Sequence, residues 1–280
     1  MAWCFVVRKE KGVLIHYEIG GYESRNESTL WCLKQADARY QWPDFNQIVI
    51  HTTDYEHPPS QYTYDENEYT YSKKHSLDRL VPDFNFHGWA QVGINDYEEF
   101  VKQIDEAGTK SYEVNKVGWI GNTNTHKARG ALFAFGKQYP HLCDIMDSGN
   151  WWVNPDDIKL NSKQYMSTPE LVAKYAIVLD IEGNGYSGRL KHLLWSHRPL
   201  LLVDRSHQEY FFKHLHEWEH YIPVKRDLSD LHEKIKWCMD HYPKACAIAE
   251  QAYQFSKKHL TREACYQQWN KIIAKHTTVL

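Results

Sequence analysis

The sequence predicts an α/β protein built from two Rossmann-like domains that face a cleft, followed by C-terminal helices. Strand-like and helix-like runs alternate in both halves of the 280-residue chain, as in sheets covered by helices. A connector-like stretch at 112–116 precedes a new strand-like run at 117–121, which indicates a domain boundary. We therefore expect domains at 1–114 and 115–261, with a helix at 262–280 that packs back on the first. One larger doubly wound sheet is the alternative.

The first predicted domain begins with a hairpin. Apolar runs at 3–7 and 13–19 suggest its two strands, 28–40 suits a helix, and 47–51 is a short buried strand. The stretch 60–78 is polar and rich in tyrosine, so we expect an irregular, exposed excursion there.

The second predicted domain ends in helices. Residues 126–139 suit a helix that stops before Pro140. Further along, apolar residues recur at helical spacing, and Thr261 is a predicted N-cap. The three apolar stripes are Leu231, Ile235 and Cys238; Ala245, Ile248, Ala249, Ala252 and Phe255; and Cys265, Trp269, Ile272 and Ile273.

Composition argues against two classes of partner. A net charge of −3 gives no global attraction to nucleic acid or an anionic membrane, and no apolar run reaches membrane-spanning length. The six cysteines include no CxxC pair, which indicates reduced thiols in the cytoplasm. We expect no signal peptide. The 11 Trp and 19 Tyr suit either packing or sugar recognition.

A glycine-rich turn in the second half joins a strand to a helix. Residues 175–181 are strand-like, 183–189 contain three glycines and end in Arg189, 190–195 suit a helix, and 200–203 form a second strand. Glycine permits a ligand to approach the backbone closely and permits positive φ. The first amides of a helix favour an anion, and arginine can bind phosphate bidentately. A nucleotide diphosphate fits this turn, and so does a tight turn with a surface arginine.

Acidic residues near these strands are candidates for binding or proton transfer. Asp180 and Glu182 resemble a DxD metal clamp, but Arg189 can neutralise a diphosphate without metal, and we favour a metal-free site. Asp54 follows a short buried strand, where it can serve as a base or simply form a turn. Glu209 can bind ribose hydroxyls or act as a first-turn acid.

The segment from His216 to His220 matches the HExxH motif of zinc hydrolases. Zinc chelation by this motif needs a helix, because the two histidines must lie one turn apart on the same face. Pro223 follows too closely for a continuous helix. A zinc hydrolase is therefore a minor alternative.

The ordered motifs of the second half resemble glycosyltransferase family 90, the capsule-associated and protein O-glucosyltransferase group. The similarity covers roughly residues 45–270. It runs through 174–175, Gly183, 187–193, 209–212, 220–224 and 227–231, with looser matches at 119–125, Arg129 and 49–55.

The resemblance implies a GT-B fold and an inverting, metal-independent transfer from a UDP-sugar to a hydroxyl of a glycan or glycoprotein. It assigns the catalytic base to Asp54, and we expect Tyr55, His87 and Trp89 on the acceptor side. The implied donor-binding residues are Gly121, Asn122, Thr123, Arg129, Gly183, Tyr186, Ser187, Gly188, Arg189 and Glu209.

The sequence departs from the family at two points. Thr123 stands where the family has an arginine, for which Arg129 is a candidate replacement, and Glu56 stands where it has a proline. No ER-retention tail is seen, and in this respect the sequence resembles compact members of the family that are encoded by large algal viruses. UDP-xylose is our favoured donor and UDP-glucose the next, with no cofactor. A non-catalytic sugar-binding module remains the second alternative, because the many Tyr and Trp side chains suit sugar contacts.

Overall fold

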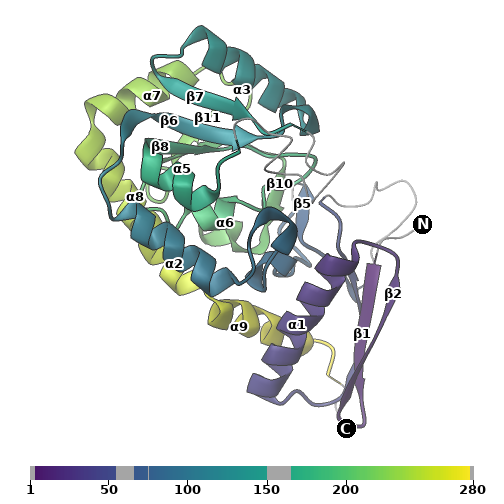
Figure 1. Ribbon diagram of the computed structural model, residues 1–280. Coiled ribbons are helices and arrows are strands. Elements are labelled where there is room, and N and C mark those ends of the chain that lie inside the picture. Colours follow the sequence, from purple (N-terminus) through teal and green to yellow (C-terminus); the bar gives the residue numbers. More distant parts are fainter. Residues whose placement is uncertain (1–3, 55–65, 75, 150–164, 278–280) are drawn as a thin grey trace.

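Two β-sheets of different type organise the chain (Figure 1). The computed structural model describes residues 4–54, 66–74, 76–149 and 165–277. A four-stranded sheet has the order β2-β1-β3-β4, and a five-stranded sheet has the order β11-β9-β8-β6-β7. Their strands are β1 (Cys4–Glu10), β2 (Val13–Ile19), β3 (Phe45–His51), β4 (Glu68–Thr70), β6 (Val114–Gly121), β7 (Cys143–Asp147), β8 (Tyr175–Asp180), β9 (Leu200–Val203) and β11 (Ile222–Val224).

The N-terminal sheet is mixed. β1 pairs antiparallel with both β2 and β3, and β3 pairs parallel with β4. The turn between β1 and β2 holds Lys11 and Gly12 at φ of 50° and 78°, a left-handed conformation that suits a tight hairpin. The predicted hairpin is therefore confirmed.

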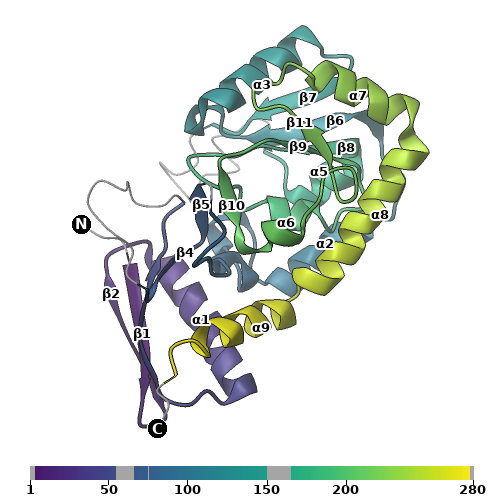
Figure 2. The same cartoon turned by 180° about the vertical axis from the view of Figure 1, so that it is seen from behind.

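Helix α1 (Glu23–Tyr40) packs against the distant helix α9 (Arg262–Ile273), and Figure 2 shows the two side by side from behind. The indole of Trp42 donates a hydrogen bond to Asn270 Oδ1 at 2.8 Å. Thr261 caps α9 by accepting the amide of Ala264 at 3.0 Å, as the sequence predicts.

The C-terminal sheet is entirely parallel, and its strand order reverses between β6 and β8. The chain passes from β6 to β7 on one side, then crosses to β8 on the other side. In open α/β sheets, such a switch point opens a crevice at the carboxyl ends of the two strands. Ligands are expected there.

Helices cover both faces of this sheet, so its strands are buried and apolar. One face packs against α3, α7 and the start of α8, and the other against α2, α5 and α6. The bounds are α2 (Tyr97–Gly108), α3 (Lys127–Gln138), α5 (Thr168–Lys174), α6 (Leu190–Leu193), α7 (Leu231–Asp240) and α8 (Tyr242–His259).

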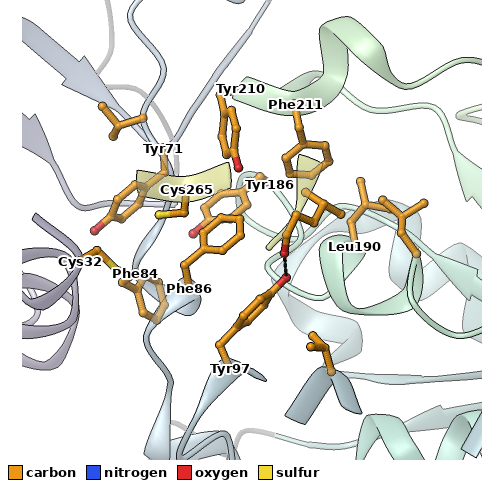
Figure 3. Packing of buried hydrophobic residues seen from close by; sticks show 14 of the residues in the cluster. Cys32, Tyr71, Phe84, Phe86, Tyr97, Tyr186, Leu190, Tyr210, Phe211 and Cys265 are labelled. Atoms are coloured by element: carbon orange, nitrogen blue, oxygen red, sulfur yellow. Dashed lines mark hydrogen bonds between the residues drawn. The ribbon is translucent and has the colours of Figure 1, made fainter. Parts of the chain in front are cut away.

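Segments from the two halves share a core and a short ladder. β5 (Ser72–Lys74) pairs antiparallel with β10 (His207–Glu209). Figure 3 shows aromatic side chains from both halves packed in one cluster, including Tyr71, Phe84 and Tyr186. Four 3₁₀ turns complete the described elements: η1 (Phe84–Phe86), η2 (Ala90–Val92), η3 (Thr123–Thr125) and η6 (Tyr210–His214). The domain boundary near residue 114 stays a prediction.

Some predicted elements need correction. The stretch 60–78 was expected to be irregular, yet its described part contains β4 and β5, because both strands pair with residues distant in sequence. The connector at 112–116 overlaps β6, and α6 stops at Leu193 rather than at 195. No helix within the described ranges is both long and apolar enough to cross a membrane.

Candidate active site

Two arginines bridge the strand ends at the switch point in a reciprocal way. Arg129 follows β6 and donates to carbonyls just past β8, from Nε to Glu182 at 2.9 Å and from Nη2 to Ile181 at 3.2 Å. Arg189 follows β8 and donates from Nη1 to the carbonyl of Ile120 in β6 at 2.5 Å. The arginine that follows β6 therefore contacts the end of β8, and the arginine that follows β8 contacts β6.

Neither guanidinium forms an ion pair with a carboxylate among the described residues, although Asp180 lies near enough to raise the pKa of each. Within the described residues both bond to backbone carbonyls rather than to carboxylates. Burial lowers the pKa of Arg129 to about 10, and repulsion from Arg189 and Arg205 adds to the effect. Burial also lowers the pKa of Arg189, although Asp180 opposes it. A bound anion would relieve this repulsion.

The glycines of the turn make room for side chains rather than adopt positive φ. A Cβ on Gly183 would lie 3.2 Å from Arg129 Nη2, and one on Gly188 would lie 3.0 Å from Asn85 Nδ2. Neither glycine is in the left-handed region, so of the two properties that glycine offers, positive φ is not used at these positions. Close approach is the reason for glycine here.

The two carboxylates of the DxD-like pattern are engaged by protein groups. Asp180 accepts Ser187 Oγ at 2.7 Å and pairs with Arg205 Nη2 at 2.6 Å. Burial would raise the pKa of Glu182, but hydrogen bonds from His207 and from the amide of Ser206 lower it to about 2. Among the residues described, no three His, Cys, Asp or Glu side chains gather as a metal site would require.

Asp54 approaches the glycine-rich turn from the N-terminal sheet. Its Oδ1 pairs with Arg25 Nη1 at 2.9 Å, and its side chain is 37% exposed. Its carbonyl accepts the amide of Tyr186 at 3.2 Å. Asp54 is one of the two carboxylates that oppose the lowering of the Arg129 pKa, after Asp180. The structure therefore brings the predicted base and the predicted phosphate turn together.

The segment after β6 is ordered by Asn122, which is buried. Its side chain accepts the amide of Asn124 at 2.7 Å and donates to the carbonyl of Gly149 at 2.6 Å. The amide of Thr123 donates to Asp147 at 3.1 Å. A Cβ on Gly121 would lie 2.7 Å from the Trp119 ring, so glycine lets the strand end pack closely.

Other predicted residues lie further from the turn. His87 stacks on Trp31, and its Nδ1 lies 3.1 Å from Ser28 Oγ, one helical turn along α1 from Arg25. Trp89 packs edge-on against Phe84. Tyr55 lies outside the described residues.

Glu209 is 2% exposed and faces into the protein. Burial raises its pKa to about 7, although Lys191, at 3.2 Å, opposes the shift. Sequence reasoning assigned no role to Lys191, Arg25 or Arg205. For Lys191 the sequence offered one signal, a charged side chain within the largely apolar run 190–195, because a buried charge needs a partner.

The HExxH segment is not helical, which removes the geometry that a zinc hydrolase needs. η6 ends at His214, and Trp218 has φ of 61°. His220 Nδ1 accepts the amide of His216 at 3.0 Å, so a local turn already uses that nitrogen. Pro223 belongs to β11, so the chain is extended and not helical there.

Relatives of known name match only parts of this chain. "Protein O-glucosyltransferase 2" of Danio rerio is 35% identical over 103 residues, covering 37% of this chain and 21% of the relative. "Protein O-glucosyltransferase 3" of Homo sapiens is 26% identical over 166 residues, covering 56% and 32%. The chain thus spans a third or less of these two relatives.

Among solved structures, Anabaena HepE in complex with UDP and glucose resembles the chain with a TM-score of 0.44 and 10% identity, covering 75% of this chain and 57% of that one. The sequence model of Glycosyl transferase family 90 matches residues 6–280, nearly the whole chain. The chain belongs to glycosyl transferase family 90.

Proposed function

We propose that this protein transfers a sugar from a UDP-sugar to a hydroxyl group of a glycan or glycoprotein. The reciprocal bridging of the β6 and β8 ends by Arg129 and Arg189 supports the proposal most directly. It places two guanidiniums, bonded to backbone carbonyls rather than to carboxylates, at a switch point, where a diphosphate binds in α/β sheets. Membership of the family agrees with this chemistry.

Asp54 is the proposed base of an inverting transfer. It would take the proton of the acceptor hydroxyl while that oxygen attacks the anomeric carbon from the face opposite UDP. Arg189 and Arg129 would stabilise the charge that develops on the departing diphosphate. The partial exposure of Asp54 and the hydrogen bond from the Tyr186 amide to its carbonyl support this arrangement.

Arg189→Ala tests the phosphate assignment. Losing a charge-assisted hydrogen bond typically costs about 1.5–3 kcal/mol, or roughly ten- to hundredfold in UDP affinity. Calorimetric titration with UDP measures it. Arg39→Ala is the matched control, because Arg39 is 64% exposed and pairs only at the surface. Unchanged UDP affinity in folded R189A would contradict the assignment.

The transfer is proposed to need no metal. Asp180 and Glu182 support this, because both carboxylates are already bound to protein groups. Turnover measured in EDTA should equal turnover in buffer alone. Activity that vanishes in EDTA and returns with Mn²⁺ would make the two carboxylates a metal site instead.

The donor sugar is proposed to be xylose or glucose. UDP-xylose was favoured from the resemblance, whereas the names of the relatives point to glucose. Turnover of the two UDP-sugars, measured side by side, distinguishes them. A non-catalytic sugar-binding module would bind a UDP-sugar without turning over any glycan acceptor.

A further inference from the structure

Two buried charges, which the proposed chemistry does not use, hold the turn between β8 and α6. Asp83 Oδ2 accepts hydrogen bonds from the hydroxyl of Tyr186 and from Lys191 Nζ, each at 2.9 Å. Lys191 Nζ also donates to the carbonyl of Gly188 at 3.1 Å and pairs with Glu209 at 3.2 Å. Two residues of the turn are therefore tied to one ion-paired cluster.

Stability alone is a poor explanation for this cluster. The side chains of Asp83 and Lys191 are 1% and 0% exposed, and desolvating two ions offsets most of what their attraction contributes. The second oxygens, Asp83 Oδ1 and Glu209 Oε2, are buried without a hydrogen-bond partner among the described residues. Apolar side chains in place of the pair would avoid these desolvated charges, but they could not bond to the Tyr186 hydroxyl or the Gly188 carbonyl.

The cluster joins the turn to the part of the chain that carries the proposed base. Asp83 precedes η1, before β6, whereas Lys191 lies in α6, after β8. The amide of Tyr186 donates to the carbonyl of Asp54 at 3.2 Å, so the turn meets this part of the chain at a second point. In the shared core shown in Figure 3, the Tyr186 ring packs edge-on against Tyr71, with 6.4 Å between the ring centroids.

We infer that Asp83 and Lys191 are positioning residues, whose ion pair fixes the turn bearing Arg189 against the strand end bearing Asp54. The inference rests on the proposed function. The pair acts on the turn through Tyr186 and Gly188, which it holds by hydrogen bonds. Loosening it would leave both halves folded but would let the Arg189 turn drift from its anion-binding geometry.

Tyr186→Phe tests the inference with the smallest change, because it removes one hydroxyl and keeps the ring. Asp83→Asn removes the charge and keeps the shape. Tyr97→Phe is the matched control: Tyr97 is also buried, and its hydroxyl donates to the carbonyl of Leu260 at 2.5 Å and accepts Trp195 Nε1 at 3.3 Å, neither of which belongs to the turn at 183–189. UDP affinity by calorimetry and kcat/KM for the UDP-sugar are measured together with thermal unfolding.

Both test variants should weaken UDP binding about three- to tenfold and lower kcat/KM by a similar factor. Y97F should lose stability and keep UDP affinity. Wild-type UDP affinity in folded Y186F, alongside a loss in R189A, would overturn the inference and leave the proposed function standing. If the wild-type protein binds no UDP, the proposed function fails and the inference fails with it.

Discussion

Replacing Asp54 with asparagine separates a role in proton transfer from a role in shaping the turn. The amide oxygen of asparagine can still accept a hydrogen bond from Arg25, which lies 2.9 Å from Asp54 Oδ1. Asparagine cannot accept the proton of an acceptor hydroxyl. General-base help is worth about 10²–10⁴ in rate, so kcat should fall by that factor.

Donor binding should barely change in this variant. The contact between Asp54 and the donor turn is made by its backbone carbonyl, which accepts the Tyr186 amide at 3.2 Å. The Asp54 side chain is 37% exposed, so solvent screens its ion pair. Losing that pair should cost roughly 1 kcal/mol of folding stability or less.

The assay pairs turnover with UDP-sugar affinity, and the chain offers a matched control. Asp44 precedes β3, at the opposite end from Asp54, and accepts the amides of Lys11 and Gly12 at 2.7 and 2.9 Å. It is a turn-forming aspartate, so Asp44→Asn should keep turnover within a few-fold. Turnover of Asp54→Asn within the same range would refute the assignment of the base.

Two further predictions follow from the buried groups. The pKa of Glu209 is raised to about 7, so the folded state binds this proton more tightly than the unfolded state, and stability should fall as pH rises from about 4.5 to about 7. Across this range the free energy of unfolding should fall by up to about 3 kcal/mol, and Glu209→Gln should abolish the decrease. Denaturant unfolding at several pH values measures it; the same decrease in the variant would argue against a raised pKa. Gly183→Ala would place a methyl 3.2 Å from Arg129 Nη2 and should weaken UDP binding several-fold. Gly130→Ala lies in α3, where open space surrounds the added Cβ. This variant should keep UDP affinity and gain up to about 1 kcal/mol in the free energy of unfolding. Equal UDP affinities in Gly183→Ala and Gly130→Ala would contradict the role of Gly183.

Local patterns in the sequence were sufficient for many elements. The hairpin at the start and the strand ending at Asp180 follow from short apolar runs. The stripes of α7, α8 and α9 follow from helical periodicity over a few turns. Helix α2 was missed although its signals were present, since Asp96 caps it and apolar residues recur at helical spacing. β7 was missed because it is an edge strand with mixed polar and apolar residues.

The candidate site was only partly accessible from sequence. The glycine-rich turn, Arg189 and Asp54 could be selected from motifs and from the family resemblance. Their mutual placement could not, because it depends on which strands become neighbours at the switch point and on how the N-terminal sheet meets that edge. That order is a property of long-range pairing, which local periodicity does not encode.

The sequence by itself determined many of the element types, the glycine-rich turn and the family. Only the tertiary structure decided which charges meet: Arg129 reaches the end of β8, and Asp83 pairs with Lys191 108 positions away. The physical reason is that charges interact through distance in space and through burial, and neither quantity can be read from spacing along the chain.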